Sequence, residues 1–276
     1  MKYTVITTFH QAGLELYGQR MINTFEQHWP DEVDLVVYAE NCNPRTTKSN
    51  VRVEQLLEVS KECKRFVKRH RDNPRAHGDP NPESSTGVSR KKAFRWQAVR
   101  FCYKVFATAH AMQNINSDWL IWLDADTHTH TSVPRDFLHT VCPQTHMISY
   151  LGRGETYHSE CGWVAYNKNH KLAAQFVEQF VSMYITDEIF SLREYHDSYV
   201  WDHVRKIYQR NHGAQFYNLN PEGNTKGLAG HPFINSELGL YLDHMKGDRK
   251  HRGHSKAKEV KLHSDHPYWQ KVLGLK

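Results

Sequence analysis

One buried strand that ends in two carboxylates constrains the fold of this chain more than any other segment. The apolar run WLIWL, residues 119–123, leads directly into Asp124 and Asp126. Because the run does not alternate with polar residues, it predicts a strand covered on both faces, as in a parallel sheet flanked by helices. Two residues apart, the carboxylates would share one side of the strand's carboxyl end, where open α/β sheets bind ligands.

Strand and helix patterns alternate along much of the chain. Residues 2–9 and 33–40 have the β-branched and apolar character of strands, and residues 11–30 between them repeat apolar side chains at helical spacing. Such a βαβ unit predicts a mostly parallel sheet. The same patterns predict further strands at 146–152 and 161–167, and further helices at 89–112, 169–185 and 196–208. Residues 71–90, rich in proline and glycine, predict a mobile loop.

The length and composition fit one globular domain. The 276 residues are 39% hydrophobic, enough for a single large core. No apolar run reaches the roughly 18 residues of a membrane span, and the first residues lack a signal-peptide pattern, so we expect an intracellular, cytoplasmic protein. The five cysteines are scattered without a C-x-x-C pair, which predicts reduced thiols. The predicted class is α/β, with a mixed, mostly parallel sheet flanked by helices and an irregular C-terminal portion after about residue 223.

Positive charge is concentrated in two segments. Residues 61–104 hold thirteen lysines and arginines against four acidic residues, and residues 245–263 hold seven against two, whereas the whole chain has a net charge of +6. Such concentration favours a polyanionic or phosphorylated partner. A solvated basic face without a partner is the alternative.

The carboxylate pair is expected to need a cation, because two like charges placed together repel each other. A hard divalent ion such as Mg²⁺ or Mn²⁺, shared with phosphate oxygens of a substrate, suits this pair. The alternative is a structural pair that caps the following turn. An EF-hand starting at Asp124 is excluded, because Thr129 and Arg135 stand where that loop needs glycine and glutamate.

Two histidines follow the pair at the same spacing. If the strand continued through Thr127, His128 and His130 would join both carboxylates on one face, as in a transition-metal hydrolase. We expect instead that Thr127 begins a turn toward Pro134 and that both histidines lie on the surface. The chain has no P-loop, and the sequence GRG at 152–154 lacks the third glycine of a dinucleotide-binding motif.

The segment LIWLDADT at the end of a central strand resembles the D-x-D site of nucleotide-sugar glycosyltransferases with the A-type fold (GT-A). Further segments are similar to phage-encoded glycosyltransferases of this class: RKKAFRWQAVRFCYKVFA, YLGRGETYHSECGWVAYN, HDSYVWDHVR and GHPFINSELGLYLDHMKGDRKHRGHS. The resemblance spans most of the chain from residue 90 to residue 255. It implies a single domain, with a nucleotide-binding half at 1–130 and an acceptor half with the C-terminal segment at 131–276.

The resemblance also implies a metal site and a donor. Asp124 and Asp126 match the pair that holds Mn²⁺ or Mg²⁺ against the diphosphate of a nucleotide-sugar, with a UDP-sugar expected. Asp124 would lie nearer the nucleotide, and Asp126 would be the more direct ligand. In the family a third ligand often comes from a C-terminal H-x-x-G-x-x-K-P-W segment. His263 is the candidate here, although its surroundings lack the glycine and lysine, and His231 is its rival.

Other residues resemble the family's substrate contacts. Arg95, Arg100 and Lys104 match donor-phosphate contacts, which would neutralise the charge that gathers on a departing diphosphate. Alternatively, these three residues lie on the exposed side of an amphipathic helix and contact no donor. Asp197, at a predicted helix start, and Glu160, between two strands, are candidate catalytic carboxylates, as base, nucleophile or hydrogen-bond acceptor. Alternatively, Asp197 is the N-cap residue of that helix.

The charge distribution, rather than a motif, predicts the acceptor. DNA bound through residues 61–104 and 246–261 would bring a hydroxymethylated base of phage DNA to the metal site, in the cytoplasm of an infected bacterial host. A cell-surface glycan or lipopolysaccharide is the alternative acceptor. A non-catalytic nucleic-acid-binding protein and a metal-dependent hydrolase are alternatives from other classes.

Overall fold

A single mixed sheet runs through the computed structural model, which describes residues 1–84, 87–89, 92–155, 157–223 and 225–275. Its strands stand in the order β3-β2-β1-β4-β7-β6-β8. Their bounds, in that order, are Val51–Gln55, Asp34–Glu40, Tyr3–His10, Trp119–Leu123, Glu160–Asn167, Ile148–Leu151 and Phe216–Asn218. β7 runs antiparallel to both of its neighbours, and the other adjacent pairs are parallel. The predicted mixed, mostly parallel sheet is confirmed.

The first βαβ unit is also confirmed. β1 and β2 pair in parallel, and three helical segments connect them: α1 (Gln11–Gly13), the π-helical turn η1 (Leu14–Gly18) and α2 (Gln19–His28). Met21 and Phe25 of α2 are buried against the sheet. Trp29 leaves the helix in an extended conformation, as the residue before a proline prefers.

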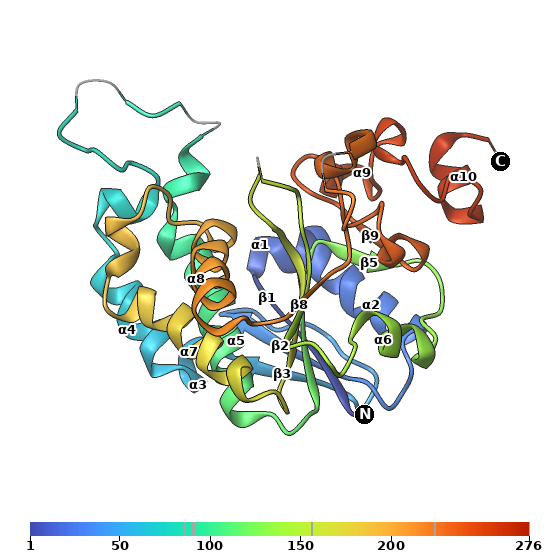
Figure 1. The fold of residues 1–276 in the computed structure, drawn as a ribbon, viewed down its shortest axis with the longest axis horizontal. Helices are drawn as coiled ribbons and strands as arrows, with labels where there is room; N and C mark the ends of the chain where they lie inside the picture. Colours follow the sequence, from blue (N-terminus) through green and yellow to red (C-terminus); the bar gives the residue numbers. More distant parts are fainter. Residues whose placement is uncertain (85–86, 90–91, 156, 224, 276) are drawn as a thin grey trace.

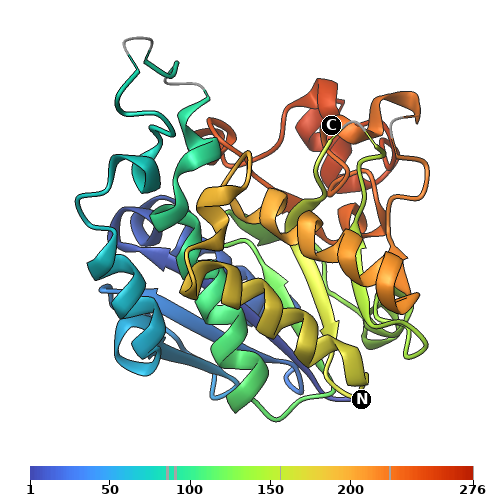
Figure 2. The ribbon, with the colours of Figure 1, turned by 60° about the vertical axis from the view of Figure 1, so that its left-hand side comes forward.

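Helices cover both faces of the sheet (Figure 1). Figure 2 shows α5 (Ala98–Asn114), α7 (Lys171–Ile185) and α8 (Asp197–His212) lying across one face, on which α4 (Lys61–Arg69) also packs. The opposite face carries α2 and α6 (Arg135–Val141). The shorter helical segments are α3 (Leu56–Val59), η2 (Pro74–His77), η3 (Ala93–Trp96), η4 (Glu188–Ser191), η5 (Thr225–Gly230), η6 (Glu237–Leu240), α9 (Arg249–Arg252), η7 (Ala257–Glu259) and α10 (Pro267–Leu273).

The central strand β4 separates two hydrophobic cores. Leu120 and Trp122 belong to the core beneath α5, α7 and α8, whereas Trp119, Ile121 and Leu123 belong to the core on the opposite face. None of the five side chains is more than 2% exposed. Burial on both faces explains why this run is continuously apolar, as expected of a strand inside a layered α/β sheet.

The helix predicted from residue 89 begins later in the structure. Ala93–Trp96 form the 3-10 turn η3, and α5 begins only at Ala98, because the backbone of Gln97 (ψ 63°) is not helical. Phe94, which a continuous helix would bury, is 44% exposed. Arg90 and Lys91, also within the predicted helix, lie outside the described residues. The described part of the preceding loop is irregular apart from η2, and its mobility stays a prediction.

The C-terminal segment is largely irregular, as predicted, but it contributes a strand. β9 (Leu242–His244) pairs antiparallel with β5 (Thr127–Thr129), which directly follows the carboxylate pair. Figure 1 shows this segment, in orange and red, gathered around β5 and β9. The turn predicted from Thr127 is therefore wrong, because strands of three residues are too short to show a periodicity.

Two expectations from the sequence concern membrane spans and cysteines. Within the described residues, no helix combines the length and apolar character needed to cross a membrane. All five cysteines are buried and free.

Candidate active site

The carboxylate pair lies in the connection between β4 and β5. The Asp126 carbonyl accepts a hydrogen bond from the N–H of Met245, the residue after β9 (2.8 Å). In the register of the small sheet, Thr127 lies opposite His244. Pairing of β5 with β9 therefore brings His244, 118 residues further along the chain, to the carboxylates.

His244 completes a cluster of potential metal ligands with Asp124 and Asp126. Its Nε2 lies 3.1 Å from Asp126 Oδ1 and 3.6 Å from Asp124 Oδ2. One ligand atom from each of the three residues lies within 4.8 Å of the other two. Two carboxylates and one imidazole are suitable ligands for Mn²⁺ or Mg²⁺, so the donor set fits the divalent ion that the sequence predicts.

Two lysines lie against the same carboxylates. Lys250 Nζ is 3.0 Å from Asp126 Oδ2, and Lys104 Nζ is 3.1 Å from Asp124 Oδ1. Burial by itself raises the pKa of Asp126, but His244 and Lys250 outweigh it and hold this pKa below its usual value. Asp126 is therefore a carboxylate, as a ligand for a cation must be.

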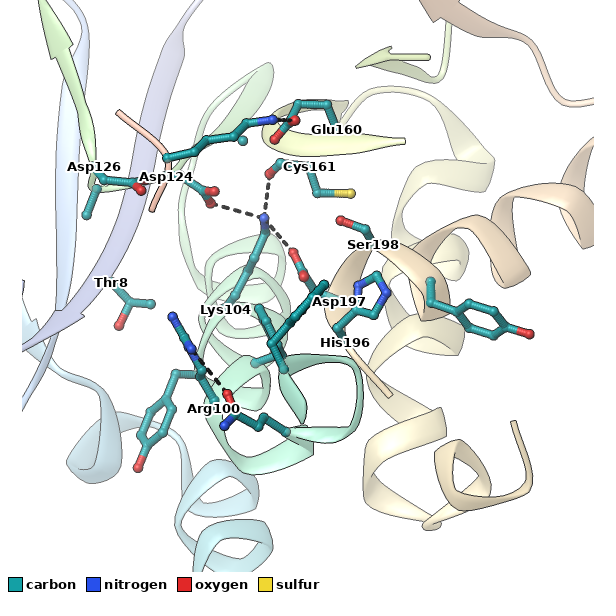
Figure 3. Close-up of a pocket in the computed structure, with 18 of the residues that line it drawn as sticks. Thr8, Arg100, Lys104, Asp124, Asp126, Glu160, Cys161, His196, Asp197 and Ser198 are labelled. Atoms are coloured by element: carbon teal, nitrogen blue, oxygen red, sulfur yellow. Dashed lines mark hydrogen bonds and ion pairs between the residues drawn. The ribbon is translucent and has the colours of Figure 1, made fainter. Parts of the chain in front are cut away.

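Lys104 also joins this cluster to Asp197 (Figure 3). Its Nζ lies 2.8 Å from Asp197 Oδ2 and donates to the Cys161 carbonyl. Only 12% of the side chain is exposed, so Lys104 does not lie on the exposed side of a helix, which was its alternative place. Burial lowers the pKa of Lys104, but Asp124 and Asp197 outweigh it and raise this pKa. Burial likewise raises the pKa of Asp197, but Lys104 outweighs it and lowers this pKa.

The structure brings both candidate catalytic carboxylates to the same cleft. Asp197 is the first residue of α8, and the N-cap position belongs to His196. Glu160 is the first residue of β7, where its carboxylate pairs with Lys246 and lies 3.8 Å from His244 Nδ1. Both carboxylates are buried, and each has a lysine partner.

Arg95 and Arg100 line the cleft as well. Arg95, in η3, pairs with Glu194 at 3.1 Å, and Arg100, in the first turn of α5, donates to the Gln97 side chain at 3.1 Å. The bond to Gln97 engages only one arm of the Arg100 guanidinium, whereas Arg95 pairs with a buried carboxylate.

The two histidines predicted as third metal ligand are held by backbone carbonyls instead. His263 Nε2 lies 2.8 Å from the Ser236 carbonyl, on a left-handed backbone (φ 62°). His231 is buried, and its Nε2 lies 3.0 Å from the His244 carbonyl. His244, rather than His263 or His231, lies with the two carboxylates, and His231 contacts the backbone of the segment that carries His244.

A signal for His244 was present in the sequence. Residues 244–250, HMKGDRK, have the H-x-x-G-x-x-K spacing that was sought around His263, without the final Pro-Trp. Gly247 has a φ of 58°, a left-handed conformation that favours glycine. The turn at Gly247 lets the chain return, so that Lys250 reaches the carboxylate of Asp126.

His128 and His130 are neither on the surface nor in the carboxylate cluster found among the described residues. His128 is 4% exposed, and its Nε2 lies 3.2 Å from the Tyr268 hydroxyl. The His130 ring stacks on Tyr268 with centroids 3.8 Å apart. The predicted surface position is wrong, because α10 covers this side of β5 with Tyr268 and Trp269.

The cleft above Asp124, Asp126 and His244 has a volume of about 1550 Å³. Its lining includes Thr8 and Glu40 at the carboxyl ends of β1 and β2, the cluster after β4, and the start of α8. Small-molecule sites usually measure roughly 300–1,000 Å³. The cleft therefore has room for a ligand larger than most small molecules, or for two ligands together.

No protein-family model and no curated protein sequence matches this chain. It is similar to the solved structure of apo mouse xyloside xylosyltransferase 1, at 10% identity over 86% of this chain and 94% of that one, with a TM-score of 0.46. It is also similar to a glycosyltransferase involved in the glycosylation of the major capsid of PBCV-1, at 12% identity over 92% and 98% of the two chains, with a TM-score of 0.47. A third similar structure is the apo glycosyltransferase GlyE of Streptococcus pneumoniae TIGR4, at 12% identity over 85% of this chain and 51% of that one, with a TM-score of 0.45.

Proposed function

We propose that this protein is a metal-dependent glycosyltransferase of the D-x-D type, which moves a sugar from a nucleotide-sugar to a hydroxyl acceptor. The convergence of Asp124, Asp126 and His244 at the carboxyl end of the central strand carries this proposal. A cleft of substrate size opens over them, with Lys104 and Lys250 against the same carboxylates. A UDP-sugar is the donor we propose, as the resemblance of the D-x-D segment implies.

Different residues would bind the metal ion and the diphosphate. Asp124, Asp126 and His244 would hold Mn²⁺ or Mg²⁺, which, when bound, would neutralise charge on the diphosphate as the sugar departs. Lys250 contacts Asp126 in the structure, and its ammonium would exchange this partner for a phosphate oxygen of the donor. Arg100 lines the same cleft and offers a second phosphate contact.

Asp197 and Glu160 are the proposed carboxylates of the reacting centre. Lys104 keeps Asp197 ionised, so Asp197 would accept a hydrogen bond from a sugar or acceptor hydroxyl and orient it. Glu160 faces the Nδ1 side of the His244 ring and would accept a hydrogen bond from a hydroxyl of the transferred sugar.

We propose a glycan hydroxyl as the acceptor. Four of the seven basic residues at 245–263 form ion pairs within the protein: Lys246, Arg249, Lys250 and Lys256. This segment therefore offers less free positive charge to DNA than its composition suggests. Phe94 and Tyr157, which line the cleft, are 44% and 53% exposed, as suits aromatic platforms for sugar rings. The second hypothesis is that the acceptor is hydroxymethylated phage DNA. In that case the protein would act in the cytoplasm of the infected host.

Calorimetric titration with UDP and with GDP, with and without Mn²⁺, tests the donor site. We expect nucleotide binding that requires Mn²⁺ and weakens at least about 10-fold in Asp126→Asn, since loss of a ligand costs no less than loss of its outer-shell support. Asp118→Asn, at the opposite end of β4, is the matched control. Nucleotide binding that is absent, or equal in Asp126→Asn, would contradict the proposal. Hydrolase activity lost in His128→Ala would instead support the hydrolase alternative.

A further inference from the structure

The geometry points to a second metal site in the same cleft, formed by His158, Glu194 and His196 and suited to a late first-row divalent ion such as Zn²⁺. One ligand atom from each of the three residues lies within 4.8 Å of the others, and all three line the cleft. None of them belongs to the cluster after β4. The inference therefore does not depend on the proposed glycosyl transfer.

The separations of the ligand atoms suit a tetrahedral ion. Glu194 Oε2 lies 2.9 Å from His196 Nε2 and 4.0 Å from His158 Nε2. Ligands about 2.1 Å from a tetrahedral zinc ion lie about 3.4 Å from one another. The separation of 2.9 Å is shorter than this ligand-to-ligand distance, and that of 4.0 Å is longer. The 4.0 Å contact is too long for a hydrogen bond, so His158 faces Glu194 without being bonded to it.

Glu194 is held so that a single oxygen faces both histidines. Its side chain is only 5% exposed, and its Oε1 accepts from Arg95 at 3.1 Å. This bond leaves Oε2 for the two imidazoles. Figure 3 shows His196 beside Asp197, at the start of α8. The His196 ring is buried and lies against Phe101, with centroids 6.0 Å apart, so packing at the helix start limits its direction.

A carboxylate also faces the second ring nitrogen of His158, at a distance longer than a hydrogen bond. His158 Nδ1 faces Asp202 Oδ2 of α8 at 4.0 Å, on the side of the ring away from Glu194. Histidine ligands almost always direct their second nitrogen to a carboxylate or carbonyl. Asp202 also accepts from the N–H (2.8 Å) and Oγ (2.7 Å) of Ser159, which fixes the backbone next to His158.

The ligand types select the ion. Two imidazoles and one carboxylate suit Zn²⁺ and its neighbours, whereas the oxygen-rich cluster at Asp124 and Asp126 suits Mn²⁺ or Mg²⁺. The His158 side chain is 40% exposed and lines the cleft, so water or a substrate can reach the proposed site. A water or a substrate hydroxyl would complete the coordination there, as at zinc sites with three protein ligands.

Titration of the whole protein with Zn²⁺, followed by calorimetry, tests the site. With Mn²⁺ in excess to occupy the cluster of Asp124, Asp126 and His244, wild-type protein should bind one Zn²⁺, and His158→Ala should weaken this binding at least about 10-fold. His158 is the residue to change because it is half-exposed, so its removal leaves the fold intact. Asp126→Asn, in the other cluster, and His251→Ala, at an exposed histidine of α9, should leave the Zn²⁺ affinity unchanged.

Cobalt provides a second readout. Co²⁺ added to the wild-type protein should give the visible absorption of a tetrahedral site, and His158→Ala should abolish it. Failure of wild-type protein to bind Zn²⁺ would overturn the inference. Equal Zn²⁺ affinity in His158→Ala, or Zn²⁺ binding lost only in Asp126→Asn, would overturn it as well, and neither result would bear on nucleotide binding with Mn²⁺.

Discussion

Lys104 neutralises carboxylates from two separate elements. It reaches from α5 to Asp124 after β4 and to Asp197 at the start of α8. Without this ammonium, the carboxylate of Asp197, 10% exposed, and that of Asp124, 31% exposed, would face each other across the cleft. Breaking a buried ion pair by removing one partner typically costs about 3–5 kcal/mol, because the other charge stays uncompensated.

We expect Lys104→Met to lower the free energy of unfolding by about 3 kcal/mol, toward the lower limit for a buried pair because the cleft admits some water. Mn²⁺ should restore part of this loss, since the ion would supply positive charge beside Asp124. Urea unfolding with and without Mn²⁺ measures both effects. Lys64→Met, at an exposed position of α4, is the control and should change the stability little. A Lys104→Met protein as stable as the wild type would show that the two carboxylates do not depend on this lysine.

At the scale of elements, the site depends on the close approach of β7 to β9. A Cβ at Gly162 of β7 would lie 2.5 Å from Cε1 and 2.7 Å from Nδ1 of the His244 ring. Only glycine leaves room for the imidazole at this position. β7, an interior strand of the large sheet, therefore also sets how far the His244 ring extends toward the carboxylates.

Gly162→Ala should displace His244 and weaken Mn²⁺ binding about 10-fold, since the ligand moves while the carboxylates stay in place. Calorimetric titration with Mn²⁺ measures the change. Gly230→Ala is the matched control, because a Cβ there has no heavy atom within 4 Å. Unchanged Mn²⁺ affinity in Gly162→Ala would argue that His244 is not a metal ligand.

At the scale of the whole molecule, both halves implied by the resemblance contribute to one sheet and one site. β4 pairs with β1 of the first half and with β7 of the second. Asp124 and Asp126 come from residues 1–130, whereas His244, Lys250 and Asp197 come from residues 131–276. The site therefore exists only when the chain has folded as a whole.

Buried neutral histidines should make the whole fold sensitive to acid. Burial, aided by Arg20, lowers the pKa of His128 to about 2, and burial lowers those of His130 and His231 to about 3. As the pH falls, the histidines of the unfolded chain take up protons near pH 6.5, whereas the same histidines in the folded chain stay neutral until the pH is much lower. Stability is therefore full above pH 6.5 and falls as the pH drops toward 3, by up to about 1.4 kcal/mol per pH unit for each histidine.

His130→Phe tests this sensitivity, because phenylalanine keeps the stacking on Tyr268 and cannot take up a proton. Thermal unfolding between pH 7 and pH 4 should show a shallower loss of stability for His130→Phe than for wild-type protein. His251→Phe, at an exposed position, should leave the slope unchanged. An equal slope in His130→Phe and wild-type protein would mean that His130 does not titrate in this range.

The local pattern of the sequence determined the long elements and the carboxylate pair. Continuous apolar runs and helical spacing identify β1, α2, β2, β4, β7 and α7, because the period of buried side chains is a property of neighbouring residues. Asp124 and Asp126 follow β4 directly, so their place at the carboxyl end of the sheet required only the strand. The start of α5 was misplaced because the break at Gln97 depends on contacts of η3 rather than on local apolar spacing.

Tertiary structure alone decided which distant side chains join that pair. The β5–β9 ladder brings His244 to the carboxylates and not His263, and no periodicity marks three-residue strands. The direction of Lys104, inward to Asp124 and Asp197 rather than outward to water, depends on how α5 and α8 pack against the sheet. The packing of His128 and His130 beneath α10 likewise depends on a helix that lies about 140 residues further along the chain. Apart from the H-x-x-G-x-x-K spacing at 244–250, these choices rest on long-range packing and charge pairing, which a single sequence does not contain as a local pattern.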